Sequence, residues 1–217
     1  RTIVGSIPEN TSNIHLFSAT LPPEVLEFIS TRNILKNPFK ILVKQEQLSL
    51  KGITQYYIII EEHQKYNTLK QLYESLDVSK CVVYCNSRKK VEQLTDWMLE
   101  DNHSATCING DMTQQERNSI INEYRTGKTR CLITTDLLSR GFDVQQISLV
   151  INYDVAKDPE VYIHRIGRGG RYGRKSVAIN FIDITREKDK NTLKLIENTY
   201  KINMEQLPTN YAELINQ

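Results

Sequence analysis

The chain has 217 residues, of which 39% are hydrophobic and 25% are charged, and its formal net charge at pH 7 is +2. A chain of this length and composition can bury a sizeable core and is typical of an ordinary globular protein. The small net charge excludes a protein that is positive over its whole surface, so any surface for nucleic acid must be local.

The chain begins with "RTIVGSIPEN", which lacks the regions of a signal peptide. No apolar run in the sequence approaches the length of a membrane span. We therefore expect a cytoplasmic protein that has no contact with a membrane. A start at Arg rather than Met indicates that the chain is a fragment of a longer protein.

Residues 1–43 contain one expected strand, "NIHLF", and one expected helix within "PPEVLEFISTRNIL". Because one strand and one helix cannot form a sheet, we interpret residues 1–43 as the end of a preceding domain. The polar stretch "KQEQLSLK", residues 44–51, is the expected linker. Residues 52–217 are then the second domain.

From residue 53 onward, runs that are rich in β-branched residues alternate with amphipathic stretches. The expected strands are "ITQYYIII", "KCVVYC", "ATCIN", "RCLITTD", "SLVINYD" and "SVAINF". Expected helices between them include "KYNTLKQLYESL", "KKVEQLTDWMLED" and "QQERNSIINEYRTG". The alternation predicts an α/β fold, a mostly parallel sheet with helices on both faces that is built from right-handed βαβ units.

The four cysteines of the chain lack the Cys-x-x-Cys spacing of metal sites. Each of them lies in or beside an apolar, strand-like run: Cys81, Cys85, Cys107 and Cys131. This placement predicts reduced thiols that pack as small hydrophobic side chains, and we expect no metal site.

Polar residues lie at the ends of three of the expected strands. Asn86, Ser87 and Arg88 follow "KCVVYC", Gly110 and Asp111 follow "ATCIN", and Thr135 and Asp136 lie at the end of "RCLITTD". In an open parallel sheet, ligands gather at the carboxyl ends of the strands, where helix N-termini also present free N–H groups. Small hydroxyls, a glycine backbone and arginine suit phosphate and sugar but do not distinguish bases. The pattern therefore predicts a ligand with the chemistry of a nucleic-acid backbone.

These residues also have purely structural interpretations. Ser87 is suited to cap a helix, and Thr113 with Glu116 fits a capping box. Arg88 and Arg117 would then be solvated surface charges. The same chemistry recurs at three strand ends, and both interpretations remain open at this point.

The stretch "HRIGRGGRYGRK", residues 164–175, concentrates positive charge in a glycine-rich segment. Its glycines predict a helix that begins after "DPEVY" and ends in a turn. Arginine suits phosphate because its planar guanidinium stays charged, although a basic surface stripe is an alternative. Nearby, "SRGFD" places Gly141 and Asp143 after another strand, where a carboxylate can accept hydrogen bonds from ribose hydroxyls.

The stretch "TGKT", residues 126–129, imitates the end of a P-loop. A P-loop needs a glycine where this chain has Asn122, and it runs from a strand into a helix instead of the reverse. Gly127 is better interpreted as a helix C-cap. The sequence also lacks an Asp-Glu-x-Asp run that could hold magnesium, so it offers phosphate clamps without a hydrolytic centre.

Five segments identify a family: "SAT" at 18–20, "VVYCNSRKK" at 82–90, "GDMTQQER" at 110–117, "TTDLLSRGFDV" at 134–144 and "HRIGRGGRYGRK". In order and spacing they closely resemble the later motifs of DEAD-box RNA helicases, over nearly the whole chain. Within that family, "VQQISLVINYD" and "MEQLPTNYAELI" most resemble the group of translation initiation factor 4A. A splicing-linked paralogue of the exon-junction type is the alternative.

The resemblance implies two RecA-like domains that close over ATP and single-stranded RNA, of which this chain carries the second. It implies that Arg168 is an arginine finger toward the γ-phosphate, that Arg165 supports it at the nucleotide, and that His164 belongs to the interdomain network. Gly141 and Asp143 would meet the ribose edge of ATP. ATP with Mg²⁺ would be held mainly by the N-terminal domain, so this chain alone would be inactive.

The resemblance also assigns RNA contacts and partners. The residues that would hold RNA phosphates and sugars are Asn86, Ser87, Arg88, Gly110, Asp111, Gln114, Arg117 and Thr135. Ser18 and Thr20 would couple the nucleotide state to strand separation. The implied partners of this monomeric protein are mRNA, its own N-terminal domain and the scaffold initiation factor 4G. A non-catalytic RNA-binding module and a docking platform for other proteins are the competing hypotheses.

Overall fold

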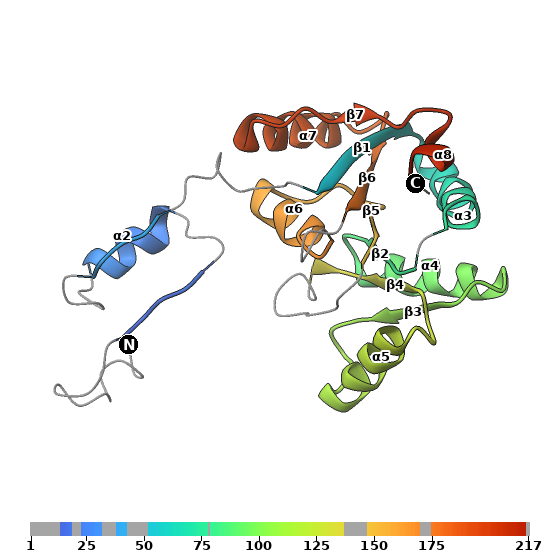
Figure 1. Cartoon of the computed structure of the whole chain (residues 1–217), viewed down its shortest axis with the longest axis horizontal. Coiled ribbons are helices and arrows are strands. Elements are labelled where there is room, and N and C mark those ends of the chain that lie inside the picture. The colour runs from blue at the N-terminus through green and yellow to red at the C-terminus, as the bar shows by residue number, and fades with distance from the viewer. Residues whose placement is uncertain are drawn as a thin grey trace. The chain divides into compact units, whose positions relative to one another are not determined.

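The computed structural model describes residues 14–18, 23–31, 38–42, 52–77, 79–136, 147–169 and 175–215. The chain forms two compact units, Arg1–Lys44 and Gln45–Gln217. Figure 1 shows that the second unit carries the sheet and most of the helices. The division falls between the first two residues of the polar stretch 44–51 that is expected to be a linker.

The first unit contains one described helix, α2 (Pro23–Thr31), which lies inside the stretch expected to be helical. Residues 14–18 have no regular secondary structure, so the prediction of a strand in "NIHLF" is wrong for its described residues. A strand requires a hydrogen-bonded neighbour to satisfy its backbone. The side chains of Phe17 and Phe39 are each 90% exposed, which fits a segment too small to bury its own apolar residues.

The described part of the second unit contains one seven-stranded sheet, in which every paired strand runs parallel to its neighbour. The strands are β1 (Ile53–Ile60), β2 (Cys81–Tyr84), β3 (Ala105–Ile108), β4 (Cys131–Thr134), β5 (Leu149–Asn152), β6 (Ser176–Asp183) and β7 (Glu205–Gln206). Their order across the sheet is β3-β4-β2-β5-β6-β1-β7. This arrangement confirms the predicted parallel α/β fold, to which β7 is an unexpected addition.

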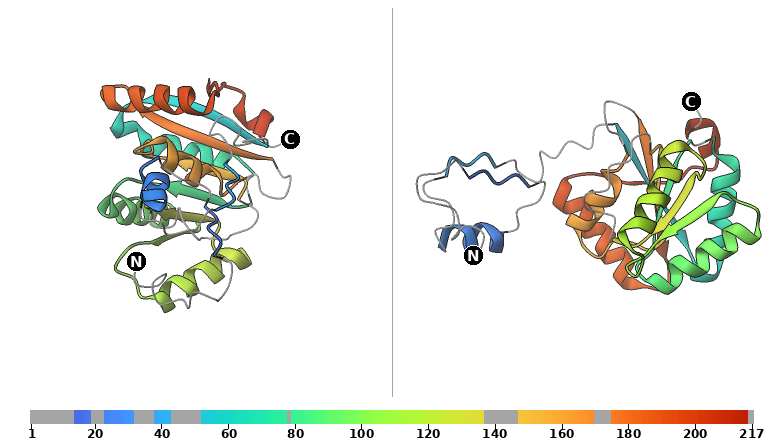
Figure 2. Two further views of the ribbon diagram at one scale, coloured as in Figure 1. Left: turned by 90° about the vertical axis from the view of Figure 1, so that its left-hand side faces the viewer. Right: turned by 90° about the horizontal axis from the view of Figure 1, so that it is seen from below.

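Helices cover both faces of this sheet, as Figure 2 shows. They are the short 3₁₀ helix η2 (Glu62–Gln64) and the α-helices α3 (Lys65–Ser75), α4 (Arg88–Glu100), α5 (Gln114–Thr126), α6 (Pro159–Ile166), α7 (Glu187–Tyr200) and α8 (Tyr211–Ile215). Among these described helices none is long and apolar enough to cross a membrane.

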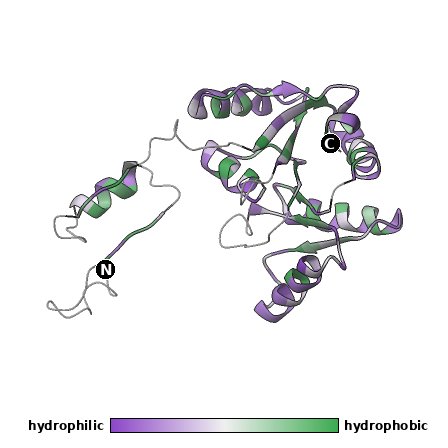
Figure 3. Cartoon of the chain, viewed as in Figure 1, coloured by the Kyte–Doolittle hydropathy of each residue, from purple (hydrophilic) through white to green (hydrophobic). Residues whose placement is uncertain are grey.

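The sheet separates two hydrophobic cores, because successive side chains of a strand point to opposite faces. On one face, Val83 packs with residues of α3 and α4, and α8 lies against the same cluster. On the other face, Val82 and Tyr84 pack with residues of α5, α6 and α7. Figure 3 shows the hydrophobic residues concentrated in the strands. Burying one large apolar side chain in such a core contributes about 1.5–3 kcal/mol.

The four cysteines behave as expected from their positions. Cys81, Cys85 and Cys131 are buried, Cys107 is partly buried, and all four thiols are free. All four contribute to the core that contains α3 and α4. The prediction that they are core side chains is therefore confirmed.

The end of α5 settles the nature of "TGKT". Gly127 caps the helix with a left-handed backbone, φ +81°, and its N–H donates to the carbonyls of Glu123 and Tyr124. The chain then enters β4, so the order is helix to strand. The prediction of a C-cap in place of a P-loop is confirmed.

Candidate functional site

Three polar strand ends lie side by side at the carboxyl edge of the sheet. The strands that they follow, β3, β4 and β2, are neighbours, and their last residues pair with one another: Ile108 with Thr134, and Thr134 with Tyr84. The segments beginning at Asn86, at Gly110 and at Thr135 therefore leave the sheet at one edge. The sequence alone predicted that these polar residues stand at strand ends, and the strand order brings the three ends together.

Two helices begin at this edge, and both are capped as their sequences predict. Ser87 Oγ accepts a hydrogen bond from Lys90 N over 3.3 Å at the start of α4. Thr113 and Glu116 form the reciprocal capping box of α5. The structural interpretation of these residues is thus confirmed. It does not compete with anion binding, because the other free N–H groups of a capped helix end still face the edge.

Two arginines border the edge. Arg88 pairs with Glu92 within α4, Nε to Oε1 over 2.8 Å, and with Asp111 from the end of β3. The Arg88 side chain is 51% exposed, and an exposed ion pair contributes no more than about 1 kcal/mol. A phosphate can therefore compete for the Arg88 guanidinium. Arg117 Nη2 donates to Gly110 O over 2.7 Å, which joins α5 to the turn after β3.

The remaining candidates on this edge are more peripheral. The side-chain nitrogen Nε2 of Gln114 donates to Asn118 Oδ1 over 2.9 Å within α5. Thr135 is partly buried directly after β4. Asn86 is exposed, but both polar groups of its side chain are engaged within the protein, since Nδ2 donates to Val155 O over 2.9 Å and Oδ1 accepts from Arg165. Its backbone N–H is engaged as well, because it donates to Asp154 Oδ2 over 2.9 Å.

Arg165 is fully buried, with a side-chain exposure of 0%. All three of its guanidinium nitrogens donate hydrogen bonds at 2.6–3.2 Å to groups at the ends of β2, β4 and β5: Asp136 Oδ1 and Oδ2, Asn86 Oδ1, Asn152 Oδ1 and Asp154 O. Because its N–H groups all donate within the protein, this guanidinium has none left to donate to a nucleotide. The expectation that Arg165 contacts phosphate directly therefore needs correction: Arg165 holds three strand ends to α6.

Arg168 lies one turn further along, just past the end of α6. The helix begins at Pro159, inside "DPEVY" and earlier than expected, because Asp158 caps it through Val161 N. It ends at Ile166, as the glycines predict. Arg168 is partly buried, and its Nε donates to His164 O over 3.0 Å.

The side chain of Tyr84 is fully buried beside Arg165. Burial raises the pKa of Tyr84 to about 12, although the positive charges of Arg168 and Arg165 lower it. The Arg165 guanidinium stands 5.1 Å from the centre of the Tyr84 ring. Tyr84 is therefore neutral at physiological pH, and its ring supports the Arg165 cation.

Three of the expected site residues, Thr20, Gly141 and Asp143, lie outside the described residues. Ser18 is described and exposed, but it belongs to the first unit. Sequence reasoning also overlooked a fourth polar strand end, Asn152 to Asp154 after β5, which carries the same signal as the other three. Among the described residues no group of three or more His, Cys, Asp and Glu side chains could hold a metal ion.

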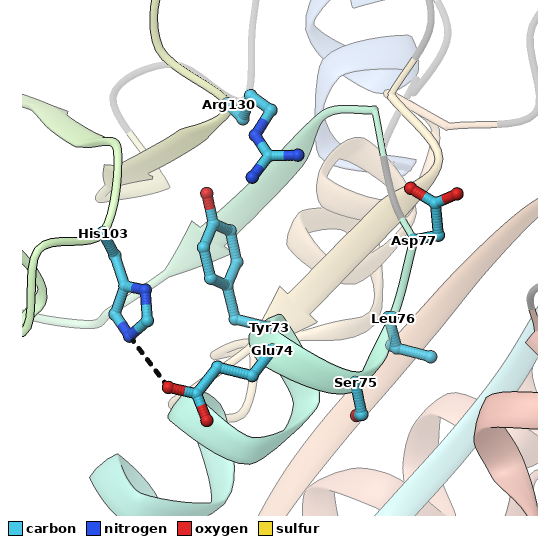
Figure 4. A pocket seen from close by; sticks show the side chains of 7 residues that line it. All are labelled: Tyr73, Glu74, Ser75, Leu76, Asp77, His103 and Arg130. Carbon is cyan, nitrogen blue, oxygen red and sulfur yellow. Dashed lines mark ion pairs between the residues drawn. The ribbon is translucent and has the colours of Figure 1, made fainter.

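Neither of two cavities in the described residues is lined by an expected site residue. The first, about 390 Å³, is lined by residues that precede β3 and β4, including His103 and Arg130, at the opposite edge of the sheet. Figure 4 shows Glu74 paired with His103 beside it. The second, about 430 Å³, lies between α3 and α4 against Tyr66 and Trp97. The candidate site is thus an open edge of the sheet and neither of these cavities.

The family model for the helicase conserved C-terminal domain matches residues 64–173, which contain the whole polar edge and most of the arginine stretch. The chain belongs to this helicase family. As a helicase C-terminal domain, it is 50% identical over 205 residues to the "ATP-dependent RNA helicase eIF4A" of Kluyveromyces lactis, covering 94% of this chain and 50% of the relative. It is likewise 50% identical over 201 residues to "Eukaryotic initiation factor 4A" of Drosophila melanogaster, covering 92% and 49%.

This helicase C-terminal domain spans about half the length of the curated relatives that it matches. Solved structures show the same fold. Dbp5 of Saccharomyces cerevisiae bound to RNA and ADP BeF3 has a TM-score of 0.88 at 29% identity, covering 99% of this chain and 57% of that one. The isolated C-terminal domain of the DEAD-box protein Dbp5 has a TM-score of 0.70 at 32% identity, covering 77% and 98%. The fold is therefore that of a DEAD-box RecA-like domain.

Proposed function

We propose that the chain is the C-terminal half of an ATP-dependent RNA helicase of the initiation factor 4A type, which separates strands in the 5′ region of mRNA. The observation that carries the proposal is the open edge on which three polar strand ends adjoin the helix of Arg165 and Arg168. An edge of this kind offers contacts to a phosphate backbone but no enclosed active site. It suits half of a cleft that two domains close over RNA and ATP.

The proposed domain layout follows from the same reasoning. Residues 1–43 would be the end of the first RecA-like domain, residues 44–51 the linker, and residues 52–217 the second domain. The exposed apolar side chains of the first unit support this layout, because a larger domain would cover them. Ser18 and Thr20 would couple nucleotide binding to strand separation.

We propose distinct roles for the residues around the arginine stretch. Arg168 would approach the γ-phosphate of ATP, and its position at the end of α6 supports this role. Arg165 would position Arg168 by fixing α6 to the sheet, and His164, whose carbonyl orients Arg168, would face the other domain. Gly141 and Asp143 would meet the ribose. Mg²⁺ and most of the ATP would be held by the N-terminal domain.

On the RNA side, the groups available for phosphate are the exposed guanidinium of Arg88 and the free N–H groups at the starts of α4 and α5. Asn86, whose N–H is already donated to Asp154 Oδ2, would contribute its backbone carbonyl to a ribose hydroxyl. Gly110 would contribute its backbone, and Arg117 would brace the turn at Gly110. The other proposed contacts to phosphates and sugars come from Ser87, Asp111, Gln114 and Thr135. None of these groups reads a base edge, so the proposed binding is independent of sequence.

The proposal is tested by combining the chain with its N-terminal half. We expect RNA-stimulated ATP hydrolysis from the mixture, or from the full-length protein, and none from the chain alone, because the chain supplies no P-loop. Phosphate release measured with and without single-stranded RNA decides the matter. A mixture that hydrolyses ATP no faster with RNA than without it would contradict the proposal.

The RNA affinity of the chain alone is expected to be weak and strongly dependent on salt. Contacts to phosphate release counterions, so the logarithm of the binding constant should fall linearly with the logarithm of salt concentration, by about 0.7 per phosphate contact. Fluorescence anisotropy with oligonucleotides of two unrelated sequences checks both features. Tight binding whose binding constant does not change with salt concentration but differs between the two sequences would favour a dedicated RNA-binding module instead.

The proposed location and partners of the protein are based on its relatives, two of which are named "Eukaryotic initiation factor 4A". We propose that the full-length protein is a cytoplasmic monomer that works on mRNA and docks on a scaffold of the initiation factor 4G type. Its C-terminal domain would take part in that docking.

A further inference from the structure

Four charged side chains meet beneath the turn that follows β2. Lys90 Nζ lies 2.7 Å from both Glu62 Oε1 and Asp154 Oδ1. Lys65, which is 0% exposed, lies with Nζ 3.0 Å from Glu62 Oε2 and 3.5 Å from Asp154 Oδ1. The Lys65 contacts are ion pairs by distance without the direction of good hydrogen bonds. We call Lys65, Lys90, Glu62 and Asp154 the charge quartet; its two positive and two negative charges balance.

The two carboxylates of the charge quartet have different further partners. Asp154 Oδ2 accepts a hydrogen bond from Asn86 N over 2.9 Å. The main-chain carbonyl of Asp154 accepts from Arg165 Nη1 over 2.8 Å, and Arg165 Nη2 in turn donates to Asn86 Oδ1 over 2.8 Å. Glu62 instead extends the quartet toward Arg186, 3.6 Å away. Asp154 is thus the member that reaches both the turn after β2 and α6.

Asp154 is ionised at neutral pH. Burial alone would raise the pKa of its carboxyl, but the hydrogen bonds from Asn86 N and Lys90, together with the charge of Lys65, outweigh burial and hold the pKa below its ordinary value of 3.8. A carboxylate accepts on both oxygens at once. Asp154 can therefore serve the lysines with Oδ1 and Asn86 with Oδ2.

We propose that Asp154 is a positioning residue that holds the turn Asn86–Arg88 in its RNA-binding conformation and joins this turn to the helix of the arginine finger. The inference rests on the proposed helicase function. It assigns a role in RNA binding to a buried side chain that touches neither RNA nor ATP. Through Asp154 and Arg165, the turn Asn86–Arg88 and α6 are joined by one set of hydrogen bonds.

Replacing Asp154 with asparagine tests this role, because the amide has the shape of the carboxylate but only one acceptor oxygen. The charged lysines take that oxygen, which turns the amide nitrogen toward Asn86 N, a second donor. Asp154→Asn should therefore break the tether to Asn86. In the full-length helicase we expect the RNA concentration for half-maximal ATPase to rise about tenfold, the equivalent of one charged hydrogen bond, with turnover at saturating RNA within about threefold.

Glu62→Gln is the matched control. It makes the same change, carboxylate to amide, against the same two lysines, but on the side of the quartet toward Arg186. We expect it to change the half-maximal RNA concentration by less than about twofold, as for other changes at partly exposed ion pairs. If both variants raise that concentration equally, the quartet acts only through its charge or its stability, and the proposal is overturned.

The chain of 217 residues gives a readout that needs neither ATP nor the other domain. Hydrogen exchange at the Asn86 amide, followed by NMR, should accelerate in Asp154→Asn and stay unchanged in Glu62→Gln. If Asp154→Asn speeds exchange of the Asn86 amide but leaves the RNA concentration for half-maximal ATPase unchanged, the proposal is overturned and the helicase function is unaffected. A wild-type helicase without RNA-stimulated turnover would overturn the proposed function itself, whatever the exchange shows.

A double variant guards against loss of folding. Asp154→Asn with Lys65→Met leaves one positive and one negative charge in the quartet and places an apolar side chain where Lys65 is fully buried. The Asn86 tether remains broken in this variant. If the double variant unfolds at the wild-type temperature and still needs more RNA for half-maximal ATPase, the positioning role of Asp154 is supported. If it needs the wild-type RNA concentration, that role is contradicted.

Discussion

Replacement of Arg168 by alanine in the full-length helicase is expected to lower RNA-stimulated ATP turnover about 10³- to 10⁵-fold, the range in which an arginine finger acts. Arg168 stands just past the end of α6, and its Nε donates to His164 O, which orients the guanidinium relative to the helix. Loss of the side chain removes a positive charge at the point where the proposed mechanism places the γ-phosphate. Steady-state ATPase at saturating RNA measures the effect.

Two further variants sharpen the result for Arg168. Arg168→Lys keeps the charge but loses the planar fork, so it should recover only part of the turnover. Lys175→Ala removes a positive charge from the same stretch at an exposed position and should leave turnover within about threefold of wild type. Near-normal turnover of Arg168→Ala would reject the finger assignment.

Replacement of Arg165 by methionine is expected to lower the free energy of unfolding of the chain by about 3 kcal/mol. Removing one member of a buried ion pair costs about 3–5 kcal/mol because the partner charge stays buried without compensation. The lower end applies here, since the Asp136 side chain is 24% exposed and water can solvate it in part. Urea unfolding of the chain, followed by circular dichroism, gives the difference.

Arg186→Met is the control for Arg165. Arg186 also lies near two carboxylates, Asp183 at 3.3 Å and Glu62 at 3.6 Å, but its side chain is 51% exposed. Its loss should cost less than the loss of Arg165, because Arg186 is largely solvated and the buried Asp183 carboxyl keeps two hydrogen bonds from Thr185. Equal costs for the two variants would mean that the buried contacts of Arg165 do not hold the strand ends together.

The open edge explains why the chain can carry specific motifs without an enclosed site. The proposed phosphate contacts, spread over the ends of β2, β3 and β4, would suit an extended polymer, which needs many weak contacts in a row. ATP needs closer confinement, and in the proposed mechanism this arises only when a second domain closes over α6. The predicted salt dependence of RNA binding and the dependence of ATPase on both halves follow from this division.

Local sequence determined most of the secondary structure of the second unit. The six expected strands formed, since β-branched runs favour extended backbone, and the caps at Ser87, Thr113 and Gly127 formed as their side chains dictate. The strand expected in "NIHLF" did not form over its described residues, because a strand depends on a neighbour that local sequence does not specify.

The tertiary structure alone decided which polar residues meet and which of the two arginines is buried. Arg165 and Arg168 look equivalent in the sequence, yet one lies buried with every guanidinium nitrogen engaged and the other stands partly exposed past the helix end. Asp154 offered no local signal of its link to Asn86, which is 68 residues away. Burial and long-range hydrogen bonds depend on strand order and helix packing. The sequence by itself therefore determined the fold class and the motifs, and packing divided the motif residues into those that remain exposed and those whose polar groups are engaged inside the protein.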